Sequence, residues 1–114
     1  MSKTYLQMQV YWVNLDPTKG SETKKHRPCL IVQSSLLNRN SSTIIVAPIL
    51  PGHKEWPFVV NIMPTKKNQL DKNRHVNLKQ LRAVDVSRIT KQLGVIEGKY
   101  RDHINQKLAF IFNL

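Results

Sequence analysis

Runs of apolar residues divide the chain into short segments that are typical of β-strands. In residues 8–15, Met8, Val10 and Trp12 recur at every second position, which predicts a strand. Two continuous apolar runs, Pro28–Ser34 and Thr43–Ile49, lie between turn-forming residues and predict central strands that are buried on both faces. Further strands are expected at residues 56–63, 75–82 and 89–95.

The last segment has the periodicity of a helix. From Glu97 onward, the apolar residues Tyr100, Ile104, Leu108 and Ile111 fall on one helical face. The chain ends in the apolar run F-I-F-N-L, which we expect to dock in the core; burial against another subunit is the alternative. Five or six short strands and one C-terminal amphipathic helix predict a single domain over residues 1–114. Its class is mainly β (α+β), a small antiparallel barrel or sheet capped by the helix.

Besides the loop at residues 16–28, four connections separate these elements. Residues 36–42 are expected to form a polar connector, residues 51–55 a turn, and residues 84–88 a short turn or a single helical turn. Residues 64–74 form a long basic connection, and connections of that length are often functional.

The loop at residues 16–28, D-P-T-K-G-S-E-T-K-K-H-R-P, carries the richest chemistry. Pro17, Gly20 and Pro28 favour a loop, because proline removes a backbone donor and glycine permits unusual dihedral angles. The loop combines an acid, a hydroxyl, a histidine and several cations, which favours chemistry on phosphate.

Net charge narrows the choice of partner. The chain has 18 Lys and Arg against 7 Asp and Glu, a formal net charge of +11. Only three acids, Glu55, Asp71 and Asp85, lie between residues 23 and 96. Such a surface attracts polyanions, so the two expected partner classes are nucleic acid and an acidic protein.

Other features exclude several classes of protein. No apolar run approaches the ~20 residues that span a bilayer, and the N-terminus lacks the apolar segment of a signal peptide. We therefore expect a cytoplasmic protein with no membrane contact. Cys29 is the single cysteine and lies in an apolar run, so we expect a buried core residue.

Metal and cofactor chemistry is not expected. The four histidines, His26, His53, His75 and His103, show neither HxH nor HxxxH spacing. No phosphate-binding glycine motif is present. Without a metal, the simplest cleavage of nucleic acid is attack of the 2′-hydroxyl of RNA on the adjacent phosphorus. That reaction needs a base, an acid for the leaving 5′-oxygen and a cation for the phosphorane charge, a task that suits arginine.

A family resemblance gives this chemistry a context. The run Y-W-V-N-L-D-P-T-K-G-S-E…H-R-P-C-L-I-V over residues 11–32 resembles the MazF/PemK (Kid) toxins of bacterial toxin–antitoxin modules. The similarity continues through S-T-I-I-V-A-P-I (42–49), E-W-P-F-V-V (55–60) and K-Q-L-R-A-V-D-V-S-R (79–88).

The resemblance implies a fold and an activity. The fold is a small SH3-like or CcdB-like barrel that forms a homodimer. The activity is metal-independent cleavage of single-stranded mRNA at short sequences, which leaves a 2′,3′-cyclic phosphate and a 5′-hydroxyl. The implied inhibitor is a cognate MazE/PemI-like antitoxin with an acidic tail.

By position, Arg27 matches the family's catalytic arginine, and its implied role is to stabilise the phosphorane or protonate the leaving oxygen. Glu22 matches an acidic loop residue of the same site, and Ser21 and His26 flank it. The further candidates for contact with RNA are Lys24, Lys25, Lys54, Trp56, Lys66, Lys67, Asn77, Lys79 and Gln80. We expect Trp56 to be partly exposed near the RNA groove and Phe58 to be buried.

The chain departs from the family pattern at three positions. Leu50 stands where the family usually has a threonine that works with the arginine. The side chain of leucine, unlike that of threonine, can neither donate nor accept a hydrogen bond. Lys79 replaces an acid and Asn77 replaces an arginine that some members carry. The general base is therefore open, and the candidate substitutes are His53 or Lys54 in the P-G-H-K turn, or His26.

These departures keep two other readings open. One is a toxin like the related CcdB proteins, which poison DNA gyrase by binding it without hydrolysis. The other is a degenerate toxin that still binds RNA or its antitoxin. The D-P-T-K-G-S-E and H-R-P segments favour the nuclease, because CcdB-like proteins lack them.

Overall fold

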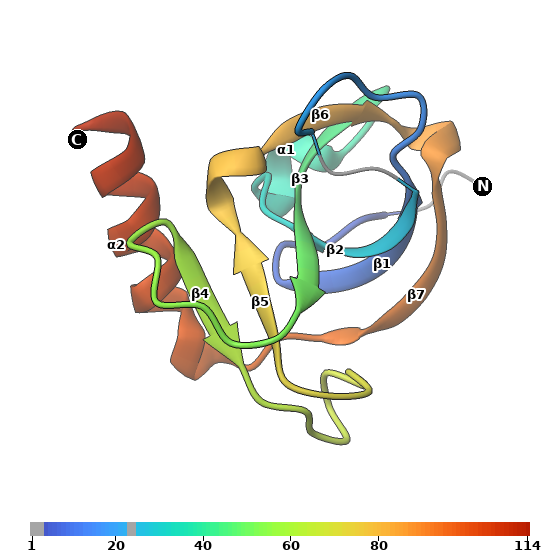
Figure 1. Ribbon diagram of the computed structural model, residues 1–114. Helices are drawn as coiled ribbons and strands as arrows, with labels where there is room; N and C mark the ends of the chain where they lie inside the picture. The colour runs from blue at the N-terminus through green and yellow to red at the C-terminus, as the bar shows by residue number, and fades with distance from the viewer. Residues whose placement is uncertain (1–3, 23–24) are drawn as a thin grey trace.

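The computed structural model describes residues 4–22 and 25–114 of the chain (Figure 1). Its main element is a 7-stranded sheet in the order β4-β5-β3-β2-β1-β7, with β6 paired to β3 outside that path. The strands are β1 (Gln9–Asn14), β2 (His26–Ile31), β3 (Thr43–Pro51), β4 (Val59–Ile62), β5 (Arg74–Asn77), β6 (Arg82–Asp85) and β7 (Ile89–Val95). The helices are α1 (Ser35–Asn38), α2 (Arg101–Phe112) and the 3-10 turns η1 (Leu78–Gln80), η2 (Val86–Arg88) and η3 (Gly98–Tyr100).

Strand β3 connects the two parts of the sheet. Its first half pairs with β6 (Ile45↔Ala83), and its middle pairs with β2 (Cys29↔Pro48). Its second half pairs with β5 (Leu50↔His75), and β5 in turn pairs with β4. In Figure 1, strands β6, β3, β2, β1 and β7 curve round as a ring, while β4 and β5 extend from it toward α2. The fold is therefore mainly β with antiparallel strands, as the sequence predicted.

Two apolar clusters stabilise these two parts. Inside the ring, Tyr11, Val13, Cys29, Ile31 and Val84 pack together with other buried residues, which include members from β3 and β7. The second cluster joins the opposite face of β1 and β2 to the extension and the helix; its members include Val10, Leu30, Ile49, Val76 and Ile104. Alternate residues of β1 and β2 thus enter different clusters, which explains why both strands are apolar on both faces.

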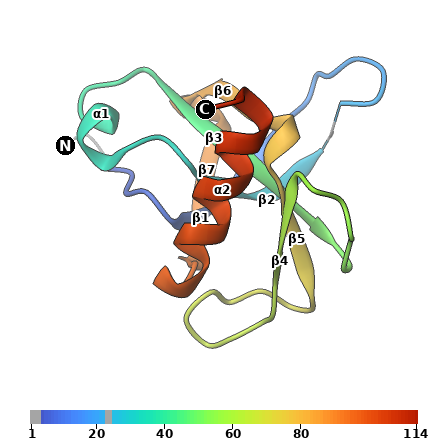
Figure 2. The same ribbon diagram turned by 90° about the vertical axis from the view of Figure 1, so that its left-hand side faces the viewer.

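Helix α2 lies along β4 on the outside of the sheet (Figure 2). Ile104 is buried, and Tyr100, Leu108 and Ile111 pack against the second cluster, as the sequence periodicity predicted. No helix among the described residues is long and apolar enough to cross a membrane.

The end of the helix corrects one prediction. Phe110 is 65% exposed and Phe112 57% exposed, so these two rings of the apolar end, unlike Ile111, do not dock in the core of this chain. These rings lie outside the face that carries Ile104 and Leu108, which is the face that packs on β4.

The single strand expected at residues 75–82 is also wrong. The chain instead forms β5, then the turn η1, then β6 on the other half of β3. Asn77 causes this break: its side-chain Oδ1 accepts a hydrogen bond from the Lys79 backbone N–H at 3.1 Å and caps the turn.

Smaller differences have similar local causes. The strand expected from Trp56 begins at Val59, because Pro57 and a turn bond from Val59 N–H to Trp56 C=O (3.4 Å) precede it. The connector at residues 36–42 overlaps the short helix α1, whose first turn is capped by the Ser34 hydroxyl.

Candidate functional site

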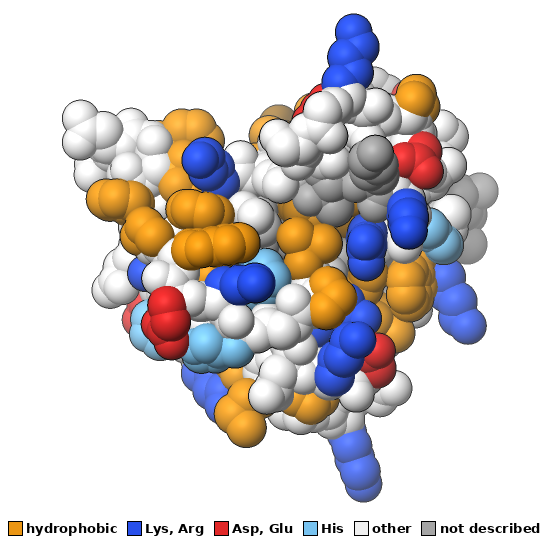
Figure 3. All heavy atoms as spheres, viewed as in Figure 1, with side chains coloured by type: hydrophobic (Ala, Val, Ile, Leu, Met, Phe, Trp, Pro, Cys, Tyr) orange, Lys and Arg blue, Asp and Glu red, His pale blue; other side chains and the backbone are white. Residues whose placement is uncertain are grey.

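A groove of about 460 Å³ opens at one end of the ring, between the loop that follows β1 and the aromatic residues before β4. Figure 3 shows this face of the molecule hollowed between α2 and the ring, with apolar and cationic side chains interleaved. The groove is lined by Leu15, Ser21, Glu22, Pro48, Trp56, Phe58, Asn77, Lys79, Gln80, Leu81 and Arg82. Six of these residues are predicted site residues that lie far apart in the sequence: Ser21, Glu22, Trp56, Asn77, Lys79 and Gln80.

Hydrogen bonds at the base of the loop hold the first wall in place. The Leu15 N–H donates to the Lys25 carbonyl (2.9 Å), and the Lys25 N–H donates to Asp16 Oδ1 (2.9 Å). At the tip, Glu22 Oε1 accepts from the Lys19 N–H at 2.9 Å. Gly20 takes a φ of +57°, which glycine adopts without strain. The loop therefore presents Glu22 to the groove from a closed base.

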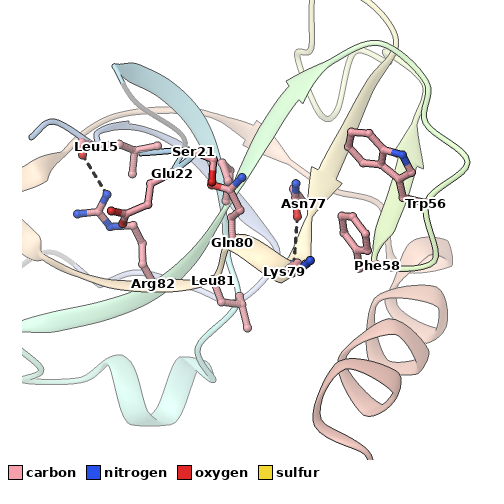
Figure 4. Close-up of a pocket in the computed structure, with 11 residues that line it drawn as sticks. Leu15, Ser21, Glu22, Trp56, Phe58, Asn77, Lys79, Gln80, Leu81 and Arg82 are labelled. Carbon is pink, nitrogen blue, oxygen red and sulfur yellow. Dashed lines mark hydrogen bonds between the residues drawn. The ribbon is translucent and has the colours of Figure 1, made fainter. Parts of the chain in front are cut away.

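Arg82 ties the loop to the floor of the groove. It comes from β6, where it pairs with Val46 of β3, and its Nη1 donates to the Leu15 carbonyl at 2.9 Å. In Figure 4, Arg82 and Glu22 lie on the same side of the groove. A guanidinium held at one end by a backbone carbonyl still offers its other donors to a phosphate.

Two aromatic rings and a lysine form the opposite wall (Figure 4). The rings of Trp56 and Phe58 are stacked, with centroids 5.5 Å apart and an interplanar angle of 21°. Lys79 Nζ lies 5.1 Å from the centroid of Phe58. Trp56 is 45% exposed, as expected; Phe58 is only half-buried, and its ring faces the groove and not the core.

Arg27 lies on β2, on the side of the strand that faces the ring's interior. Strand alternation gives Arg27 the same face as Cys29, whose cross-strand partner Pro48 lines the groove. The pairing of β2 with β3 ends at Cys29↔Pro48 and includes neither Arg27 nor Leu50. Leu50 is half-buried and pairs with His75 of β5. Arg27 is half-buried too, and it is not among the residues that line the groove.

The two candidate histidines lie outside the groove. His26 precedes Arg27 in the same strand and therefore points to the opposite face, where its Nε2 lies 3.0 Å from Thr90 Oγ1 and its ring packs beside Trp12. His53 is exposed, and its Nε2 lies 2.6 Å from Glu55 Oε1.

The remaining predicted lysines have separate positions. Lys54 and Lys25 are exposed and do not line the groove. Lys66 and Lys67 belong to the connection between β4 and β5, at the end of those strands away from Phe58 and Asn77. Lys24 lies outside the described residues.

The one cysteine of the chain is buried in the core. Cys29 is fully buried, and burial raises the pKa of its thiol to about 12, although the nearby Arg82 charge opposes that rise. Cys29 is thus the core residue that its apolar run predicted. Among residues 4–22 and 25–114, no group of three or more His, Cys, Asp or Glu side chains is arranged to hold a metal ion.

Sequence reasoning missed five groove residues: Leu15, Pro48, Phe58, Leu81 and Arg82. Arg82 is the important omission, because it is a cation in the floor of the groove. It stands in the K-Q-L-R segment that carries the family resemblance, and that segment is the sequence signal that could have identified it.

Comparison with known proteins identifies the family. Residues 6–112 match the family described as the PemK-like, MazF-like toxin of type II toxin-antitoxin systems. An endoribonuclease MazF of Staphylococcus epidermidis is 35% identical over 106 residues, covering 92% of this chain and 88% of that protein.

Solved structures share the fold. MazF from Deinococcus radiodurans superimposes with a TM-score of 0.84 at 22% identity, covering 99% of this chain and 100% of that one. An endoribonuclease in complex with its cognate antitoxin, from a mycobacterial species, gives a TM-score of 0.78 at 22% identity and covers 96% of both chains. The resemblance noted in the sequence is confirmed, and the chain belongs to the family of PemK-like, MazF-like toxins of type II toxin–antitoxin systems.

Proposed function

We propose that this chain is an endoribonuclease that cuts single-stranded mRNA without a metal ion and leaves a 2′,3′-cyclic phosphate and a 5′-hydroxyl. The observation that carries the proposal is the groove itself, which combines a carboxylate, cations and stacked aromatic rings between two walls. Family membership and the endoribonuclease MazF relative support it.

In the proposed reaction, the 2′-oxygen of one nucleotide loses its proton and attacks the adjacent phosphorus. The bond from phosphorus to the 5′-oxygen then breaks, and the leaving oxygen takes up a proton. DNA lacks the attacking hydroxyl, so the substrate must be RNA.

Glu22 is the best candidate for the proton acceptor. It is the one carboxylate or histidine among the described residues that line the groove, and an ionised carboxylate accepts protons. The Lys19 N–H holds one of its oxygens and thereby orients the carboxylate. His26 and His53, the alternatives from the sequence, would each have to move to reach the groove.

Arg27 stabilises the phosphorane or protonates the leaving oxygen. Arg82 and Lys79 hold the flanking phosphates, and Trp56 and Phe58 stack with bases. Leu50 offers no hydrogen bond, so Arg27 acts there without the hydroxyl partner that the family pattern supplies. Ser21, Asn77 and Gln80 contact the RNA from the two walls.

Two protein partners complete the proposal. An acidic antitoxin tail fits the basic groove, and a related endoribonuclease of known structure is in complex with its cognate antitoxin. A homodimer would cover the exposed rings of Phe110 and Phe112, because apolar patches of this kind are usually interaction sites. Sedimentation equilibrium of wild type and of a Phe110→Ser, Phe112→Ser variant tests the dimer.

The activity is tested by incubating the purified protein with a long single-stranded RNA in excess EDTA. We expect discrete fragments whose 5′ ends accept phosphate from polynucleotide kinase without prior phosphatase treatment. The same sequence made as DNA should remain intact. Uncut RNA at high protein excess would overturn the nuclease, and gyrase inhibition and RNA binding would then be measured. Cleavage that occurs only with added Mg²⁺ would overturn the metal-free mechanism.

A further inference from the structure

A second hollow lies beside the groove, between the start of β4 and helix α2. Its volume is about 420 Å³, close to the 460 Å³ of the groove. Val59, Val60 and Asn61 line it from β4, and His103 and Lys107 line it from α2. Segment 54–57 completes its wall. The proposed cleavage uses none of the α2 residues.

Trp56 lines both hollows, so the two adjoin at its indole ring. The ring is fixed from two directions: it stacks on Phe58 at 5.5 Å, and the His75 ring meets it at 87° with centroids 6.0 Å apart. Nearly half of its surface remains exposed. A fixed and half-exposed indole is a stacking platform for a nucleic-acid base, because it loses little side-chain entropy when the base binds.

The charges of the second hollow suit a phosphate backbone. Lys54 Nζ lies 5.2 Å from the centroid of Trp56, and Lys107 faces the same hollow from α2. Glu55 is the one acid that lines it, and its Oε1 lies 2.6 Å from His53 Nε2. Two lysines therefore face one carboxylate that already has a partner, which leaves a cationic surface.

The rim and floor of the hollow are well defined. The Asn61 side chain accepts from the Lys54 N–H at 3.0 Å and donates to the Lys54 carbonyl at 2.9 Å, which fixes the backbone of the rim. Val59 and Val60 are each 4% exposed and lie beneath. An apolar floor with cations at the edge accommodates a base and its phosphate.

We propose that this second hollow binds an RNA nucleotide that flanks the segment held in the groove. The strand leaves the groove over Trp56, and its phosphates pass Lys54 and Lys107 on the way along α2. This inference rests on the proposed function, since it takes the occupant to be the same RNA strand. It makes α2 part of the RNA-binding surface and lengthens the RNA footprint beyond the groove.

The test measures how the affinity for a short and a long RNA changes when one lysine is replaced by glutamate. The probes are fluorescein-labelled, fully 2′-O-methylated mixed-sequence oligonucleotides, which cannot be cut, in a short form of about four and a long form of about ten nucleotides. Fluorescence anisotropy gives their Kd values for wild type, Lys107→Glu and Lys91→Glu at several salt concentrations. Lys91 is the matched control, because it is exposed on β7 and lines neither hollow.

For Lys107→Glu we expect the affinity for the long probe to fall about tenfold and the salt dependence, log K against log salt, to lose roughly 0.7 of slope. The ratio of long-probe to short-probe affinity should fall, whereas Lys91→Glu should keep the wild-type ratio. Equal losses in the two variants, or an equal loss on both probe lengths, would overturn the inference.

RNA cleavage in EDTA and sedimentation distinguish a failure of this inference from a failure of the proposed function. If wild type cuts RNA in EDTA but Lys107→Glu behaves like the control, the second hollow is not a nucleotide site and the proposed function stands. If wild type neither cuts nor binds RNA, the proposed function fails and the inference with it. A change of oligomeric state in Lys107→Glu, seen by sedimentation, would assign the hollow to an interface between copies and would also overturn the inference.

Discussion

Gly94 in β7 provides a sharp test of how the fold is held together. A Cβ atom added at this position would lie 2.4 Å from the Asn68 carbonyl oxygen and 2.7 Å from the Lys67 carbonyl oxygen. Both are backbone atoms and cannot rotate away. Gly94→Ala must therefore push the connection between β4 and β5 away from β7.

The structure sets the size of this effect. Forcing a methyl group into a packed site costs about 1–3 kcal/mol. The displaced segment also carries the hydrogen bond from the Val95 N–H to the Lys67 carbonyl (3.0 Å), worth about 1 kcal/mol. We expect Gly94→Ala to lower the free energy of unfolding by about 2–4 kcal/mol, a large part of the 5–15 kcal/mol typical of a domain.

Urea denaturation followed by tryptophan fluorescence measures this difference, and Gly98→Ala is the control. No atom lies within 4 Å of a Cβ added at Gly98, so that variant should stay within about 1 kcal/mol of wild type. RNA cleavage per folded molecule should not change in Gly94→Ala, because Gly94 does not line the groove. Equal stability of the two variants would refute the packing argument.

Three further predictions concern single residues. Asp71→Asn should lower stability by no more than about 1 kcal/mol at pH 7, because the carboxylate is largely exposed. The hydrogen bond from Arg74 Nε at 2.8 Å lowers the pKa of Asp71, so its contribution is present above the ordinary pKa of about 4 and is lost as pH falls further; urea titrations of wild type and variant at several pH values should converge in acid. Phe58→Leu should weaken binding of an uncleavable RNA by at least about fivefold through loss of stacking, and unchanged anisotropy titrations would contradict the place of Phe58 in the groove. Arg82→Lys keeps the charge but loses the fork that reaches the Leu15 carbonyl, so it should lower both stability, by about 1–2 kcal/mol in urea, and RNA affinity; wild-type values for both would contradict its dual role.

The sequence predicted most strands, because continuous or alternating apolar residues indicate which positions of a strand are buried. It could not predict the break after Asn77, since a strand and a capped turn share the same local pattern in H-V-N-L-K-Q-L-R. It predicted which face of α2 packs, but it assigned the terminal rings Phe110 and Phe112 to the core, although they fall outside that face.

The site was predicted in part, and mostly through the family motif. Glu22 and Lys79 come together in one groove although long segments separate them, and composition alone gives no hint of this. The position of His26 follows from physics: neighbours in a strand face opposite sides, so His26 and Arg27 cannot both point into one groove. Arg82 was missed because its direction depends on the pairing of β6 with β3, which only the folded chain reveals.

The central claim, that Arg27 on β2 carries the chemistry by which RNA bound in the groove is cut, is tested most directly by single-turnover cleavage in EDTA. Wild type and Arg27→Ala are compared at saturating protein on the same long RNA, with urea denaturation to verify that both are folded. We predict that Arg27→Ala cuts at least about 100-fold more slowly, because the phosphorane loses its charge-stabilising donor. Cleavage by the folded variant at the wild-type rate would contradict the account.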